Sequence, residues 1–91
     1  MDAAQKIEIV CDRLPAQHNA VPGVIAAIGN RLGVWKVTVR DLHGGTCWDI
    51  RIHRPDGTEE HYVFPGEKRT PENVRRTIER ELKYHEFEHV L

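Results

Sequence analysis

The segment HEFEH, residues 85–89, has the residue types and spacing of the zinc-hydrolase motif H-E-x-x-H. In a helix, histidines at i and i+4 share one face and can chelate zinc, while the glutamate activates the bound water. Zinc enzymes with this motif need a third protein ligand, usually downstream, and only two residues follow here. We therefore expect no resident metal and no cofactor.

The same tail, residues 84–91, carries apolar side chains at helical spacing. We predict that they form a protein interface, and they are Tyr84, Phe87, Val90 and Leu91.

Basic and imidazole side chains form the second group that could do chemistry. They fall on the non-core positions of predicted strands and just before the last predicted helix: Lys36, Arg40, Arg51, His53, His61, Lys68 and Arg69. Cationic groups on a sheet and at a helix N-terminus can hold phosphates. Histidines, whose ordinary pKa is about 6.5, could also take part in acid/base cleavage of RNA.

The alternative is a solvated face made of cross-strand salt pairs, such as Arg40 with Asp49. Asp49 and Glu59 partly neutralise the cations. The face has no aromatic residue on which a base could stack, which disfavours a single-strand platform.

Between residues 34 and 64 apolar residues alternate with polar ones, which predicts three strands. Turn signals at Gly44-Gly45 and at the Pro-Asp-Gly of residues 55–57 separate them. A two-residue loop and a three-residue loop at these turns predict the pairs Val37–Ile52, Val39–Ile50, Arg40–Asp49, Ile50–Tyr62 and Trp48–Phe64. A slip of one residue would destroy this agreement, so we predict a three-stranded antiparallel meander.

Apolar spacing also predicts helices over residues 3–14, 21–33 and 71–83. In the first, the apolar residues are Ala3, Ala4, Ile7, Val10, Cys11 and Leu14, although KIEIV at residues 6–10 could instead be a short strand. In the second, Pro22 suits the first turn and Gly33 the position after the helix, and the buried stripe is Val21, Val24, Ile25, Ile28 and Leu32. In the third, Thr70 is the N-cap and the stripe is Val74, Ile78 and Leu82.

These elements predict a single α+β domain of order α-α-β-β-β-α, with the meander packed on one face by helices. Residues 1–20 would be an N-terminal helical extension, residues 21–83 an αβββα core, and residues 84–91 the tail.

The composition limits the classes of function. The formal net charge is −1, so the basic excess of a strong nucleic-acid binder is missing. The two cysteines, Cys11 and Cys47, lack C-x-x-C spacing and are expected to be buried thiols in a reducing compartment. No signal peptide and no membrane span is evident, so we expect a cytoplasmic protein without a membrane partner. The small core of a 91-residue chain leaves a homodimer open.

Residues 21–83 resemble the double-stranded-RNA-binding (dsRBD-like) fold, and within it the small HicA-type toxins. The matching residues are Gly44-Gly45, His53-Arg54-Pro55-Asp56-Gly57, Phe64-Pro65-Gly66 and Val74-Arg75-Arg76-Thr77-Ile78. The resemblance implies RNA contact and RNA cleavage. That family's catalytic histidine follows the glycine-rich turn, where this chain has Thr46 and Cys47; His43 precedes the glycines instead.

A second resemblance is to the DNA-binding arm domains of phage integrases, in which a three-stranded sheet reads the major groove. It rests on the segment CWDIRI in the middle strand and on the helix that follows the sheet.

The residues favour binding over catalysis. The first hypothesis is a module that contacts duplex RNA or DNA through the basic and histidine-bearing sheet face. The second is a protein-interaction or inhibitor protein of phage or mobile-element type, which acts through its N-terminal helix and its tail. An enzyme, either an RNase that uses His43 or His53 or a zinc hydrolase, remains the third alternative.

Overall fold

The computed structural model describes the backbone of residues 4–12 and 18–90, and the side chains of these ranges as far as residue 86. Four strands and two helices follow one another as β1 (Gln5–Cys11), α1 (Ala20–Ile28), β2 (Gly33–Leu42), β3 (Cys47–His53), β4 (Glu59–Pro65) and α2 (Pro71–Val90). Short 3₁₀ turns at His43–Gly45 and Gly66–Lys68 connect β2 to β3 and β4 to α2.

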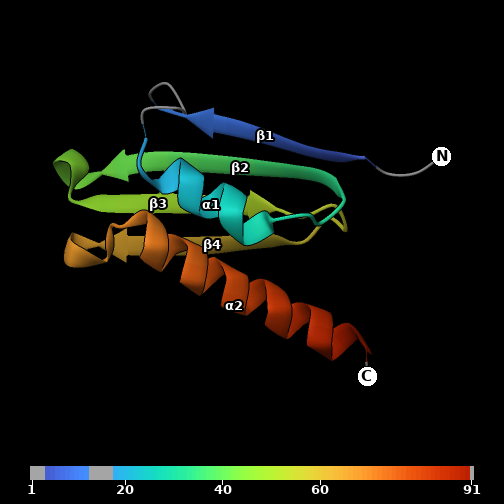
Figure 1. Ribbon diagram of the computed structural model, residues 1–91. Helices are drawn as coiled ribbons and strands as arrows, with labels where there is room; N and C mark the ends of the chain where they lie inside the picture. Colours follow the sequence, from blue (N-terminus) through green and yellow to red (C-terminus); the bar gives the residue numbers. More distant parts are fainter. Residues whose placement is uncertain (1–3, 13–17, 91) are drawn as a thin grey trace.

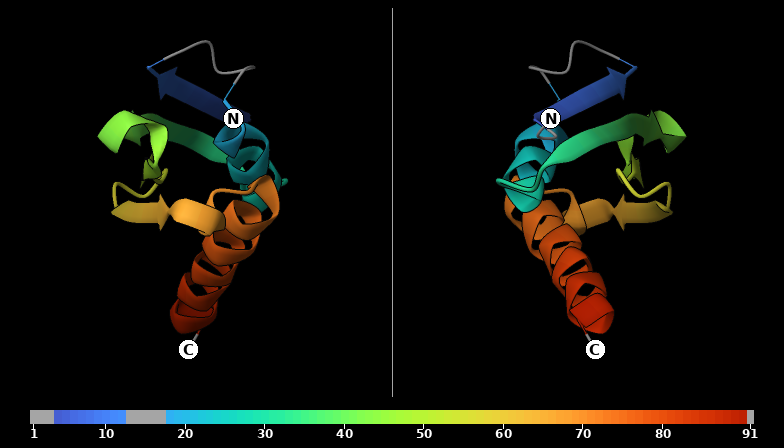
Figure 2. Two further views of the ribbon diagram at one scale, coloured as in Figure 1. Left: turned by 90° about the vertical axis from the view of Figure 1, so that its left-hand side faces the viewer. Right: turned by 90° about the vertical axis from the view of Figure 1, so that its right-hand side faces the viewer.

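The strands form one mixed sheet in the order β1-β2-β3-β4 (Figure 1). β1 pairs with β2 in parallel, and the other two pairs are antiparallel. A parallel pair needs a crossover connection, and α1 lies in that connection. Both helices lie on the same face of the sheet (Figure 2). We call the uncovered side the open face.

The N-terminal segment is a strand, so the predicted helix over residues 3–14 is wrong for residues 5–11. Ile7, Ile9 and Cys11 are partly buried against the core, while Val10 points to the open face and is exposed. This alternation has the period of two that a strand requires. Ile9 lies opposite Val37, so β1 extends the predicted three-stranded sheet to four strands. Ala3 and Leu14 lie outside the described residues.

α1 is shorter than the helix predicted over residues 21–33. It ends at Ile28, and Gly29, with a φ of 59°, takes the capping position that was predicted for Gly33. Gly33 instead opens β2. Leu32 is therefore 63% exposed and is not part of the buried stripe. Pro22 lies in the first turn, as predicted.

The predicted register of β2, β3 and β4 is confirmed. Val37 lies opposite Ile52, and Ile50 lies between Val39 and Tyr62. The turn at residues 55–57 is a three-residue loop, since the backbone N–H of Arg54 donates to the Thr58 carbonyl at 2.8 Å. Apolar side chains from these strands therefore meet on the side that the helices cover.

The start and the buried stripe of α2 are also confirmed. The Thr70 hydroxyl accepts a hydrogen bond from the backbone N–H of Asn73 at 3.1 Å, which caps the helix. The side chains of Val74, Ile78 and Leu82 are fully buried. No helix in the described ranges has the length and apolar character needed to cross a membrane.

Candidate nucleic-acid interface

The open face carries five of the seven side chains that the sequence predicted as nucleic-acid contacts: Lys36, Arg40, Arg51, His53 and His61. The pairing of the strands brings them together, because Lys36 lies opposite His53, and Arg51 lies between Thr38 and His61. They point away from the core because they occupy the strand positions between the buried ones.

Asp49 is the centre of this group. It lies on the open face yet is only 3% exposed, because longer side chains surround it. One carboxylate oxygen, Oδ2, is 3.5 Å from Arg40 Nη2 and 3.8 Å from Arg51 Nε. The other, Oδ1, contacts Nε2 of His61. A carboxylate can only accept, so Nε2 carries a proton, and the ring's Nδ1 has no partner among the described residues.

The pKa of Asp49 reports the balance of these contacts. Burial disfavours the charged form and raises the pKa. The hydrogen bond from His61, the charges of His61 and Arg51, and the contact with Arg40 outweigh burial, so the pKa lies below its ordinary value. Asp49 therefore stays charged at neutral pH and holds two guanidinium groups and one imidazole around one point.

Glu59 makes a second, smaller cluster beside the first. Its carboxylate oxygens are 3.6 Å from Arg51 Nη1 and 3.2 Å from His53 Nε2. Across β2, β3 and β4, three permanent cations (Lys36, Arg40 and Arg51) thus face two carboxylates (Asp49 and Glu59). The open face keeps a small positive excess before either histidine is protonated. On β1, Lys6 and Glu8 pair at 3.2 Å and add no net charge.

Lys68 and Arg69 do not lie on the open face. Lys68 is exposed in the 3₁₀ turn before α2. Arg69 donates from Nε to the Gly66 carbonyl at 2.9 Å and from Nη1 to the Gly45 carbonyl. Its guanidinium therefore ties the β4–α2 connection to the β2–β3 turn, a structural role that the sequence did not suggest.

Of the residues predicted as a protein interface, Tyr84, Phe87 and Val90 lie on α2. Tyr84 is exposed, while the side chains of Phe87 and Val90, and all of Leu91, lie outside the described residues. Of the two histidines of the H-E-x-x-H motif, His85 points at Glu60 of β4, with 3.4 Å between Nε2 and Oε2. The side chain of His89 is not among those described.

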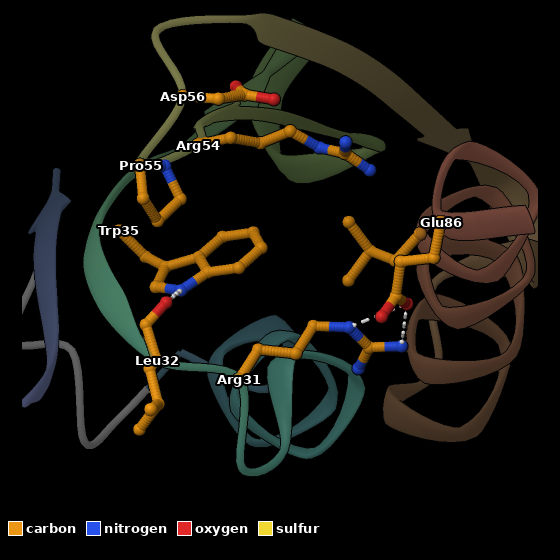
Figure 3. Close-up of a pocket in the computed structure, with 8 residues that line it drawn as sticks. Arg31, Leu32, Trp35, Arg54, Pro55, Asp56 and Glu86 are labelled. Atoms are coloured by element: carbon orange, nitrogen blue, oxygen red, sulfur yellow. Dashed lines mark hydrogen bonds and ion pairs between the residues drawn. The ribbon is translucent and has the colours of Figure 1, made fainter. Parts of the chain in front are cut away.

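A pocket of about 510 Å³ lies between the end of α1, the β3–β4 turn and the second half of α2 (Figure 3). Its apolar lining residues are Leu32, Trp35, Pro55 and Leu82, and Arg31 and Glu86 close one side. Arg31 donates to Glu86 at 2.6 Å from Nη2, and also to the carbonyls of Ala27 and Ile28 at the end of α1. The sequence did not indicate this pocket, because the helix predicted over residues 21–33 would have placed Leu32 in the buried stripe.

Comparison with known proteins identifies no relative: no protein-family model, curated protein or solved structure matches the chain. The two resemblances drawn from the sequence therefore stay predictions. The α+β class rests on the structure itself.

Proposed function

We propose that this protein is a small nucleic-acid-binding module that contacts the phosphate backbone of a duplex through the open face. One observation carries the proposal: two guanidinium groups and one imidazole converge on the single buried carboxylate of Asp49. Their side chains are still 52% (Arg40), 46% (Arg51) and 44% (His61) exposed, so each can also reach a ligand.

A phosphate suits this arrangement. Guanidinium groups bind phosphate oxygens through two parallel N–H donors, and donors already held near one another lose less freedom on binding. Asp49 cancels only part of the local positive charge, so a polyanion is still attracted. The net charge of the whole chain is −1, which predicts modest affinity and a steep dependence on salt.

The residue types on the open face favour a duplex over a single strand. The described residues place no phenylalanine, tyrosine or tryptophan on the open face, which disfavours base stacking there. Contacts to phosphates position a protein on a duplex and carry little sequence information. We therefore expect weak sequence preference.

The proposal is tested by following backbone amide NMR signals at low salt while a short RNA duplex, and then the matching DNA duplex, is added. We expect shifts at residues 36–40, 49–53 and 59–61, and the preferred duplex identifies the type of nucleic acid. The variant Arg51→Glu is expected to weaken binding about tenfold and to reduce the slope of log K against log salt by about 1. Arg76→Glu, a matched reversal at an exposed position on α2, is the control and should retain most of the affinity.

Binding that does not respond to salt, or that both variants weaken equally, would contradict the proposal. Shifts confined to α2 would do the same, because they would place the ligand on the other side of the molecule.

The second candidate function is protein interaction, and the pocket beside Trp35 is the observation that favours it. An apolar pocket next to the exposed Leu32 could accept an apolar side chain from a partner. Removing residues 87–91 keeps the Arg31–Glu86 ion pair and takes away three of the four residues predicted as the interface, namely Phe87, Val90 and Leu91. If the tail is an interface, this truncation is expected to change the mass measured by light scattering. An unchanged mass, together with retained partner capture, would rule out the tail.

A further inference from the structure

Three side chains that could bind a metal ion meet where α2 crosses β4, away from the Asp49 cluster. Glu60 lies on β4, and Glu81 and His85 lie one helical turn apart on α2. One ligand atom from each of the three lies within 4.8 Å of the other two. The cluster thus combines two carboxylates and an imidazole from two different elements.

Glu60 is held in place by neighbours that would form an outer shell. Arg54 donates from Nε to Glu60 Oε1 at 2.9 Å, and the Tyr62 hydroxyl donates to Oε2 at 3.1 Å. The side chains of Arg54 and Glu60 are only 8% and 13% exposed. Hydrogen bonds that orient a ligating carboxylate are a regular feature of metal sites in proteins.

We propose that Glu60, Glu81 and His85 bind a divalent metal ion of the zinc class. The distance between Glu60 Oε2 and His85 Nε2 is 3.4 Å. Two ligands of a tetrahedral zinc ion, each about 2.0–2.1 Å from the metal, lie about 3.3 Å apart, so these two atoms need little movement. Glu81 and His85, at i and i+4, project from the same face of α2 toward the third ligand.

The surroundings leave room for a fourth ligand. A hollow of about 380 Å³ adjoins the cluster and is lined by Glu60, His61, Tyr62, Thr77 and Glu81. Water can therefore complete the coordination from this side. Arg54 balances one of the two carboxylate charges, so we expect weaker binding than in closed structural zinc sites.

The ring proton of His85 can move from Nε2, which faces Glu60, to Nδ1 when a metal binds, whereas the histidine of the other candidate cluster cannot free its Nε2 in this way. In that cluster, which contains Cys11, Asp12 and His18, Nδ1 of His18 accepts the backbone N–H of Ala20 at 3.2 Å. The proton of the neutral ring is therefore on Nε2, which lies 3.3 Å from Asp41 Oδ1, and no lone pair is left for a metal. Nδ1 of His85 has no partner in the described part of the chain, so it can carry the proton while Nε2 binds the ion.

The test uses the full chain, titrated with Co²⁺ and with Zn²⁺. Co²⁺ in a tetrahedral site gives intense visible absorption, and Zn²⁺ should displace it and raise the melting temperature. Loss of an outer-shell partner weakens metal binding by about 10–100-fold, so loss of a ligand should cost at least as much. We therefore expect Glu81→Gln and His85→Ala each to weaken Zn²⁺ binding by about 100-fold or more. Glu79→Gln, which removes the same charge from an ion pair with Lys83 on the same helix, and His53→Ala on the open face should bind as the wild type does.

His89→Ala separates this site from the H-E-x-x-H motif. If His89→Ala abolishes binding and Glu81→Gln leaves it unchanged, the histidine pair holds the metal and the proposal is overturned. The absence of tetrahedral Co²⁺ absorption in the wild type, or equal weakening by Glu79→Gln, would overturn it as well. Far-UV circular dichroism of each variant shows whether a loss of binding reflects a loss of folding.

Discussion

Replacing Gly23 with alanine is expected to lower the free energy of unfolding by roughly 2 kcal/mol, although alanine is the better helix former. α1 crosses the start of α2 at this glycine. A Cβ atom there would lie 2.5 Å from the Pro71 carbonyl oxygen and 3.0 Å from the Val74 Cβ. The carbonyl belongs to the backbone and cannot rotate away, so the two helices must move apart. Helix propensity returns only about 1 kcal/mol of the cost.

Thermal unfolding measures the effect. In a domain of this size, 2 kcal/mol corresponds to a fall in melting temperature of about 10 °C. Ala26→Ser is the control, since it adds an atom at an exposed position of the same helix and should change stability by only about 0.5 kcal/mol. A Gly23→Ala variant as stable as the wild type would mean that the helices do not approach one another this closely.

Replacing Asp49 with asparagine is expected to cost about 1–2 kcal/mol at neutral pH, because hydrogen bonds to a charged group are stronger than those to a neutral one. Asparagine has nearly the same shape, so packing is kept and the charge is lost. The side chains of Arg40, Arg51 and His61 then lose the anion that holds them together.

The same variant gives a pH signature with a definite sign. The pKa of Asp49 is lower in the folded protein than in the unfolded chain, where it is about 3.9. Its charge therefore adds stability above the unfolded pKa, and this stability is lost as the pH falls through the folded pKa. The difference in the free energy of unfolding between wild type and Asp49→Asn should be present at about pH 5 and should shrink as the pH falls below about 4. Urea unfolding at pH values on both sides of this range measures the difference, and a difference that widens in acid would contradict the assignment.

The parts of the fold that the sequence predicted correctly depend on local signals. Alternation and the Pro-Asp-Gly turn determine the register of β2 to β4, and Thr70 marks the start of α2. The first strand was predicted only as the alternative to a helix, because its residues fit two periods. Ile7, Val10 and Cys11 suit a helix, while Ile7, Ile9 and Cys11 suit a strand. The edge of β2, which is distant in the sequence, decides between them.

The candidate sites were predicted only in part, for a similar reason. Alternation alone placed Arg40, Arg51 and His61 on one face. It could not show that they converge on Asp49, because the convergence depends on the conformations that these long side chains adopt across neighbouring strands. The cluster of Glu60, Glu81 and His85 depends on where α2 crosses β4, and residues twenty or more positions apart carry no local signal of that crossing.

The parallel pairing of β1 has a consequence for the order of folding. β2, β3 and β4 are joined by short turns, so their contacts close small loops and form early. β1 joins the sheet through a crossover that includes α1, and its other edge has no neighbouring strand in the described sheet. It adds contacts of long sequence separation, whose loop-closure entropy opposes early formation. β1 is therefore the strand that we expect to dock last and to open first, and its amide hydrogens should exchange with solvent faster than those of β3 at the centre of the sheet.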